Sequence, residues 1–256
     1  MANKHTHLGG ASADRIEVRG RDLVSDLIGR FSFTEMFLFH LLGTEPSSLQ
    51  RAITDSVMVA IMEHGLVPSI IASRLTVLGA PESYQGAVAA GLLGVGDRFA
   101  GTASECARLL DQIVAQPAAE RAQQSAALVD SYRHDGRAVP GFGHPTHRRR
   151  DPRVPRLLEI ARINGARGQY IEALGLLEAA VARAVGRQLP TNVSAAIAAV
   201  LREAGLPAQT LRGVVLTARC AGIVGHLQEE AAEPVADAMW KAVEQAVTYQ
   251  PAKRHD

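Results

Sequence analysis

The chain is poor in aromatic residues and holds only two cysteines. Phe, Trp and Tyr together make up 4% of its 256 residues, so a buried core has to be built from Ala, Leu, Val and Ile, a composition that favours helices. Cys106 and Cys220 share no spacing typical of a metal site and imply no disulfide framework. Because both lie in alanine-rich helical contexts, we expect each to behave as a small buried hydrophobe.

A charge bias, long apolar runs and a secretory signal are also absent. The formal net charge is +1, which gives no general attraction to nucleic acid or to a membrane surface. No apolar run approaches the roughly 18 residues of a membrane span, and no secretory pattern opens the chain. These absences predict a cytoplasmic protein with no nucleic-acid or membrane partner. The histidines are too scattered to predict a metal site.

Helical periodicity dominates what is present. Apolar residues recur at helical spacing along nearly the whole chain, and no segment shows sustained strand-like alternation. We therefore expect an essentially all-α fold that follows a disordered polar leader over residues 1–14. The expected helices span residues 22–28, 34–42, 48–63, 68–78, 83–93, 102–114, 120–135, 154–163, 169–186, 193–204, 208–227 and 234–247.

The most informative segment is a loop between two of these helices. Residues 140–145 read PGFGHP, which places one imidazole beside a bend, and residues 146–153 read THRRRDPR, which is strongly basic. A histidine gains or loses a proton near neutral pH, and arginines pair with carboxylates or phosphates. This combination suits a polyanionic substrate that undergoes acid–base chemistry. The alternative is a plain turn followed by a solvated basic face, because Gly and Pro punctuate turns everywhere.

The wording of this loop resembles a family signature. Gly141–His144, followed by Asp151–Arg153, is similar to the signature of the citrate synthase superfamily. Further segments resemble the family in the family's order, namely His64–Ser69, Gly96–Gly101, Asn192–Ser194 and Ala218–Gly222. The resemblance runs from Val18 to Tyr249 and looks like the short citryl-CoA lyase branch, which is related to the C-terminal lyase module of ATP-citrate lyase.

The resemblance implies a citrate synthase-like fold with a large and a small helical domain. It places the first part of the large domain at residues 15–138. The CoA-binding loop and the small domain would follow at residues 139–190, and residues 191–256 would return to the large domain. It also implies a homodimer.

The resemblance assigns side chains to the citrate end of a substrate. His64 matches the histidine that contacts the citrate or oxaloacetate end, and His144 matches the histidine that hydrogen-bonds the substrate hydroxyl or carbonyl oxygen. Arg153 and Arg219 match arginines that pair with substrate carboxylates, for which a planar guanidinium is well suited. On the residues alone, His64 would be a helix-end cap and Arg219 a salt-bridge residue.

A CoA ester as substrate, with no permanently bound cofactor, is implied as well. The backbone of the glycine-rich loop matches the segment around the CoA adenine, namely Pro140, Gly141, Phe142 and Gly143. Three arginines beyond it are placed to meet the CoA phosphates, namely Arg148, Arg149 and Arg150.

Three positions depart from the family pattern. Phe99 stands where citrate synthases carry a histidine that stabilises the acetyl-CoA enol, which argues against efficient synthase chemistry. Ser194 stands in place of the catalytic aspartate, and losing a positioned general base typically costs about 10²–10⁴ in rate. Residues 228–233 are acidic where the family often supplies a basic residue for a substrate carboxylate.

Two functions lead on these grounds, beside a third possibility, a helical protein with a vestigial site whose basic loop contacts RNA or another protein. The first is a citryl-CoA lyase-like enzyme that cleaves or forms a 3-hydroxyacyl-CoA such as citryl-CoA, with oxaloacetate and acetyl-CoA as the fragments. Its catalytic residues would be His64, His144 and Ser194. The second is a catalytically impaired family member that binds a CoA ester or polycarboxylate as a sensor or partner subunit. The three departures favour this second function.

Overall fold

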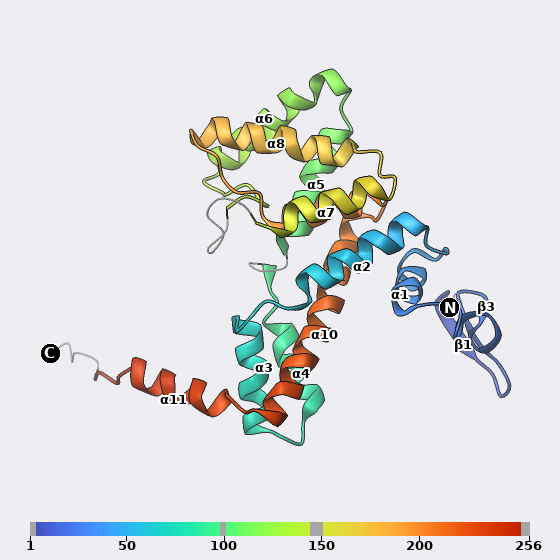
Figure 1. Ribbon diagram of the computed structural model, residues 1–256, viewed down its shortest axis with the longest axis vertical. Coiled ribbons are helices and arrows are strands. Elements are labelled where there is room, and N and C mark those ends of the chain that lie inside the picture. Colours follow the sequence, from blue (N-terminus) through green and yellow to red (C-terminus); the bar gives the residue numbers. More distant parts are fainter. Residues whose placement is uncertain (1–3, 98–100, 144–150, 252–256) are drawn as a thin grey trace. The chain divides into compact units, whose positions relative to one another are not determined.

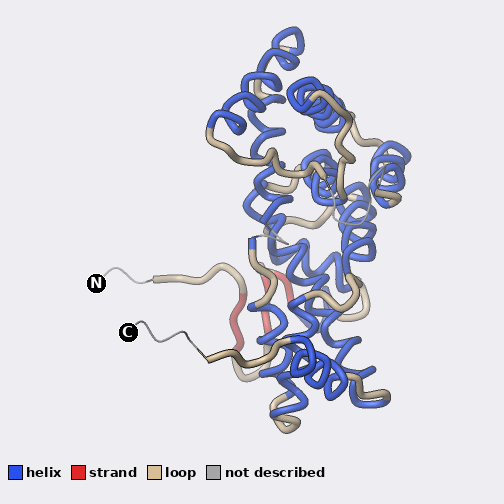
Figure 2. The backbone as a smooth tube through the Cα atoms, turned by 90° about the vertical axis from the view of Figure 1, so that its left-hand side faces the viewer, coloured by secondary structure: helices blue, strands red, loops and turns tan. Residues whose placement is uncertain are grey.

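The fold is almost entirely helical, as the sequence predicts (Figure 1). The computed structural model describes residues 4–97, 101–143 and 151–251. Strands occur only near the N-terminus in the described part, as the red segments of Figure 2 show. The elements are β1 Gly9–Ala11, β2 Ile16–Val18, β3 Arg21–Asp22, η1 Leu23–Leu27, α1 Phe33–Leu42, α2 Ser48–Met62, α3 Pro68–Gly79, α4 Tyr84–Leu93, α5 Thr102–Val114, η3 Ala118–Glu120, α6 Arg121–His134, α7 Arg153–Ile163, α8 Gln169–Val185, α9 Val193–Glu203, η4 Ala208–Thr210, α10 Leu211–Ala232 and α11 Ala236–Ala246.

The N-terminal segment differs from the expected disordered leader. β1 pairs with β2 in antiparallel register, with Gly10 opposite Glu17, and β2 pairs with β3. A two-residue turn joins β2 to β3, and both of its residues, Arg19 and Gly20, have positive φ, as tight hairpins require. The strands are two or three residues long, too short for an alternating apolar pattern to reveal them. The leader prediction is therefore wrong for the residues of β1.

The chain divides into two compact units, each made of two segments distant in sequence. Unit 1 comprises residues 1–57 and 102–212, and unit 2 comprises residues 58–101 and 213–256. The predicted domain division at residues 138 and 190 stays a prediction.

The core of unit 1 is built around α9. Every residue from Ala195 to Leu201 is buried, and α5, α7 and α8 all pack against this helix. The alanine-rich sequence makes this packing possible, because small side chains let several helices approach one axis. The N-terminus of α9 follows directly on the Asn192 segment, so a helix that is buried from Ala195 to Leu201 carries that segment.

The core of unit 2 lies between α3, α4 and the second half of α10. Its buried residues are Ile70, Ala87, Ile223 and Leu227. A glycine permits the closest approach: a Cβ added to Gly91 would lie 2.8 Å from Ile223 Cδ1. The α11 helix also packs against α3. This packing holds the α3 and α10 side chains of the polar network described below.

Candidate active site

In unit 1, the glycine-rich loop is bound to the segment that precedes α9. The Gly143 amide donates to the Pro190 carbonyl at 2.8 Å, and the Asn192 amide donates to the Gly141 carbonyl at 3.0 Å. The Asn192 side chain adds a third bond, because its Nδ2 donates to the Gly143 carbonyl at 3.0 Å. The predicted CoA-binding loop is thus tied to the N-terminus of α9 by main-chain and side-chain hydrogen bonds.

The contacts of Asn192 and Gly141 explain why asparagine and glycine occur at these two positions. Asn192 caps α9, since its Oδ1 accepts from the amides of Ser194 at 3.0 Å and Ala195 at 3.4 Å. Gly141 has a φ of +95°, and a Cβ at this position would lie 2.7 Å from the Cβ of Ala195. Only glycine therefore fits the loop where it crosses α9.

Asp151 is the buried anchor of the segment that leads into α7. Its side chain is fully buried and accepts from Arg153 Nε at 2.9 Å, from Arg153 Nη2 at 2.8 Å and from the Val193 amide at 3.1 Å. Burial opposes ionisation, but the hydrogen bonds from Arg153 and Val193 outweigh it and lower the pKa of Asp151. Asp151 therefore stays a carboxylate and connects α7 with α9.

Arg153, predicted to bind a substrate carboxylate, is held by a carboxylate of its own chain. Two of the five guanidinium N–H donors face Asp151. The side chain is 24% exposed, so the remaining donors are not sealed from solvent. The sequence marks Asp151 only as part of the signature. Its position two residues before Arg153 is the feature from which this ion pair could be predicted.

Ser194, predicted to be catalytic, lies half-buried in the first turn of α9. His144, Arg148, Arg149 and Arg150 lie outside the described residues, as does Phe99. Of the predicted site residues, the structure thus brings the Pro140–Gly143 loop next to the segment that carries Ser194. It does so through the main-chain bonds of Gly141 and Gly143.

In unit 2, the structure brings His64 and Arg219 together. Both line one small pocket, whose other walls are Val67, Pro68, Ser69 and Val95. His64 is exposed and lies just beyond the last residue of α2, while Arg219 projects from α10. A histidine and an arginine in one pocket can bind a carboxylate and an adjacent oxygen, which is the chemistry predicted for this pair.

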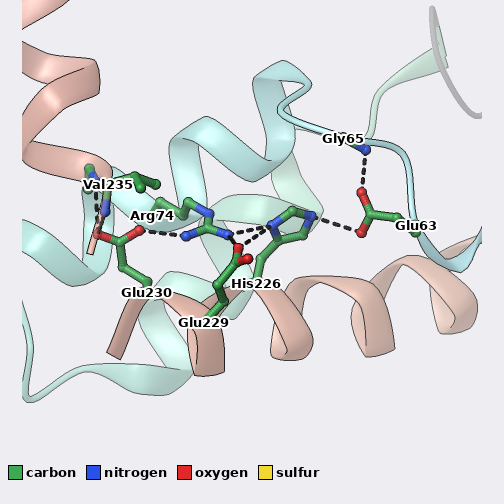
Figure 3. A network of polar contacts seen from close by, with 8 residues as sticks. Glu63, Gly65, Arg74, His226, Glu229, Glu230 and Val235 are labelled. Carbon is green, nitrogen blue, oxygen red and sulfur yellow. Dashed lines mark hydrogen bonds and ion pairs between the residues drawn. The ribbon is translucent and has the colours of Figure 1, made fainter. Parts of the chain in front are cut away.

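A polar network occupies the same unit (Figure 3). Arg74 of α3 is 1% exposed and donates to Glu230 at 2.7 Å and to Glu229, both on α10. Arg74 Nη2 also lies 2.7 Å from His226 Nδ1, and His226 Nε2 lies 2.9 Å from a Glu63 oxygen. The acidic stretch at 228–233 is thus in part the counter-charge of a buried arginine rather than a solvated acidic face.

Glu230 also connects the network to the N-terminus of α11. One of its oxygens accepts from the Val235 amide at 2.9 Å and from the Ala236 amide at 2.8 Å. Although burial opposes ionisation, these bonds and the Arg74 guanidinium lower the pKa of Glu230. No local sequence signal indicates this arrangement, because Arg74 and Glu230 are 156 positions apart.

The two cysteines differ. Cys106 is completely buried, and burial raises the pKa of its thiol to about 12, so it is an unreactive core residue, as expected. Cys220 is partly exposed, and the prediction of burial is wrong for it because its position on α10 does not face the core fully. Among the described residues, no group of three potential ligands is placed to hold a metal ion. No described helix is both long and apolar enough to cross a membrane.

The family follows from comparison with known proteins. The family model described as "Citrate synthase, C-terminal domain" matches residues 11–240. The chain belongs to the citrate synthase family. Among curated relatives, citrate synthase from Synechocystis sp. is 25% identical over 207 residues, which is 78% of this chain and 50% of that protein. ATP-citrate synthase beta chain protein 2 from Arabidopsis thaliana is 27% identical over 217 residues, covering 77% and 35%. The chain spans half or less of the length of these relatives.

Solved structures add a neighbour of similar length. Citryl-CoA lyase from Hydrogenobacter thermophilus superposes with a TM-score of 0.85 at 26% identity, covering 99% of this chain and 96% of that one. ATP citrate lyase from Methanothrix soehngenii, in complex with citrate and coenzyme A, superposes with a TM-score of 0.77 at 19% identity, covering 99% and 42%. These likenesses confirm the predicted citrate synthase-like fold and the resemblance to the lyase branch.

Proposed function

We propose that this protein is a citryl-CoA lyase, which cleaves citryl-CoA or a related 3-hydroxyacyl-CoA to a keto acid and acetyl-CoA. The observation that carries the proposal is the match to the Hydrogenobacter thermophilus citryl-CoA lyase along nearly the full length of both chains. The shared pocket of His64 and Arg219 supports it, because an imidazole and a guanidinium together suit the carboxylate end of such a substrate.

The reaction makes four demands on the side chains. A base removes the proton of the tertiary hydroxyl, the carbon–carbon bond then breaks to leave a ketone, and the electron pair passes to the thioester fragment as an enolate. Protonation of that enolate gives acetyl-CoA. Cationic groups must hold the carboxylates throughout, and hydrogen-bond donors must stabilise the developing charge.

The family resemblance suggests how these demands are divided. His64 and Arg219 hold the oxaloacetate end, and His144 exchanges the hydroxyl proton. Arg153 offers its remaining donors to a second carboxylate, with Asp151 fixing the plane of the guanidinium. The Pro140–Gly143 backbone holds the CoA adenine, and Arg148, Arg149 and Arg150 pair with its phosphates.

Ser194 favours a second function. A serine in the first turn of α9 replaces the aspartate expected there, and a hydroxyl does not exchange a carbon-bound proton as a carboxylate does. The alternative is therefore a family member that binds a CoA ester or a polycarboxylate without turnover, as a sensor or partner subunit.

An assay of the wild type beside Ser194→Asp separates the two functions. An acidic residue in the first turn of a helix is favoured by the helix dipole, so the variant should fold. If the wild type releases keto acid from citryl-CoA, it is a lyase. A silent wild type with an active variant identifies a binder. In that case CoA or citrate should still raise the melting temperature of the wild type, since ligands that bind only the folded state stabilise it.

We also propose a homodimer. Several large apolar side chains are exposed on the single chain, among them Leu93 at 85% and Trp240 at 53%. Exposed apolar residues favour association where they form a contiguous patch, and the family resemblance implies such a dimer. Sedimentation equilibrium should give about twice the chain mass of 27.2 kDa, and a monomer at micromolar concentration would refute the proposal.

A further inference from the structure

The carboxylate of Glu63 contacts both Gly65 and His226 (Figure 3). One Glu63 oxygen accepts from the backbone amide of Gly65, so the residues on either side of His64 are tied to each other. The other oxygen lies 2.9 Å from His226 Nε2, an ion-pair distance whose angle departs from that of an ideal hydrogen bond. His226, which projects from α10, therefore contacts the turn from Glu63 to Gly65 that contains His64.

Arg74 decides which nitrogen of His226 carries the proton. Its Nη2 lies 2.7 Å from His226 Nδ1. A guanidinium only donates, so Nδ1 has to accept, and the ring proton is left on Nε2, the nitrogen that faces Glu63. Arg74 thus sets the tautomer that can donate to the Glu63 carboxylate.

Side-chain exposure increases along this series of contacts from Arg74 through His226 to Glu63. The side chain of Arg74 is 1% exposed, that of His226 is 11% exposed and that of Glu63 is 65% exposed. Arg74 and His226 project from two packed helices, α3 and α10, whereas Glu63 lies just beyond the end of α2. A rigid interior pair therefore reaches out to an exposed turn, and functional groups on loops need such support to hold their geometry.

We propose that His226 is a positioning residue for His64, acting through Glu63. This inference rests on the proposed function in one respect, namely that His64 contacts the substrate in the pocket it shares with Arg219. Arg74 fixes the His226 ring, the ring fixes the Glu63 carboxylate, and the carboxylate fixes the turn from Glu63 to Gly65. His64 then enters the pocket in one orientation.

Two substitutions of His226 separate its contact with Arg74 from its contact with Glu63. In His226→Gln, the side-chain amide reaches the position of Nε2 and can still donate to Glu63, but the Arg74 contact is lost. In His226→Asn, the amide oxygen stays near the position of Nδ1 and can accept from Arg74, but the Glu63 contact is lost. The substituted side chains are both neutral amides, so polarity is closely matched.

We expect a clear loss of activity in His226→Asn and little change in His226→Gln. His226→Asn should lower kcat/KM for citryl-CoA by about tenfold to a hundredfold, the usual consequence of misplacing a reacting group by about 1 Å. His226→Gln should stay within about threefold of the wild type. Glu63→Gln keeps an acceptor oxygen for only one of its two neighbours and should lie between His226→Gln and His226→Asn. Glu63→Ala removes both acceptors and should behave like His226→Asn. Glu233→Gln, an exposed acid outside the network, is the matched control.

A spectroscopic readout makes the test independent of turnover. The ring resonance of His64, assigned by its disappearance in His64→Gln, should move in His226→Asn and Glu63→Ala and stay in place in His226→Gln and Glu233→Gln. If the wild type cleaves nothing but the resonance follows this pattern, the proposed function fails while the positioning role stands. If His226→Asn and His226→Gln affect the resonance and kcat/KM equally, the positioning proposal is overturned.

Discussion

Each of the two units holds one buried charge among its candidate functional residues, but the ion-pair partner of that charge comes from a different distance along the chain in each unit. In unit 1, buried Asp151 is paired with Arg153, two residues along the chain. In unit 2, buried Arg74 is paired with Glu230, 156 residues away. The first pair forms within a short motif and the second only once α3 and α10 have packed. A local pair can hold a loop, whereas a distant pair ties helices together, so we expect their removal to have different consequences.

The largest effect is expected from Arg74→Met. The substitution leaves the Glu230 carboxylate, 7% exposed, without its charged partner, and breaking a buried pair from one side typically costs about 3–5 kcal/mol. Chemical denaturation should show a loss of this size in the free energy of unfolding. The double variant Arg74→Met with Glu230→Gln should recover part of it. An unchanged midpoint for the single variant would mean that Arg74 does not tie the helices of unit 2.

Asp151→Asn is expected to cost less, about 1.5–3 kcal/mol, the range of charge-assisted hydrogen bonds. Because the folded-state pKa of Asp151 is lowered, its stabilising contribution is fully present above the ordinary value of 3.8 and is lost as the pH falls through the lowered folded value. The difference in unfolding free energy between wild type and variant should therefore shrink below that ordinary value. A difference that grows toward low pH would contradict the lowered pKa.

Gly141→Ala tests the loop that the Asn192 segment holds. The added methyl group meets the Cβ of Ala195 at 2.7 Å and the backbone keeps a positive φ, so we expect about 1–3 kcal/mol of destabilisation. Gly143→Ala is the matched control, since its φ is also positive but no atom of the described residues lies within 4 Å of the added Cβ. It should cost only about 1 kcal/mol. Equal losses in thermal denaturation would show that the contact with α9 has no effect.

The smallest effect is expected from Glu229→Gln. Its carboxylate contacts Arg74, but the side chain is 62% exposed, and solvent-exposed ion pairs contribute about 0–1 kcal/mol. Comparison of this variant with Glu230→Gln measures how much of the Arg74 network depends on burial. A loss for Glu229→Gln as large as that for Glu230→Gln would show that exposure does not set the strength of these pairs.

The sequence is a good guide where its signal is periodic or local. The helices lie within a few residues of their predicted positions because apolar spacing reports helical faces directly. The loop from Pro140 onward and Asn192 stand out as short motifs, and the structure shows that these two segments bond to each other. The single helix predicted over residues 22–28 is wrong at its start, because Asp22 ends a strand and caps the short η1 turn with its side chain.

What the sequence does not reveal depends on contacts between distant residues. In the sequence, the acidic stretch at 228–233 indicates that the family's basic residue for a substrate carboxylate is missing. The structure shows that Glu229 and Glu230 pair with Arg74, which lies on another helix and could not be matched to them from the sequence. The contacts of His226 are likewise hidden, because its neighbours Glu63 and Arg74 are far from it in the sequence. The three-stranded N-terminal sheet escapes prediction for a different reason, namely that its strands are shorter than one alternating pattern.

The most direct test of the proposed function is the release of oxaloacetate from citryl-CoA by the purified wild-type protein, followed through a coupled dehydrogenase. We predict turnover, with one acetyl-CoA formed for each oxaloacetate released and loss of the signal in His64→Ala. No keto acid from citryl-CoA or from any related 3-hydroxyacyl-CoA would contradict the lyase function.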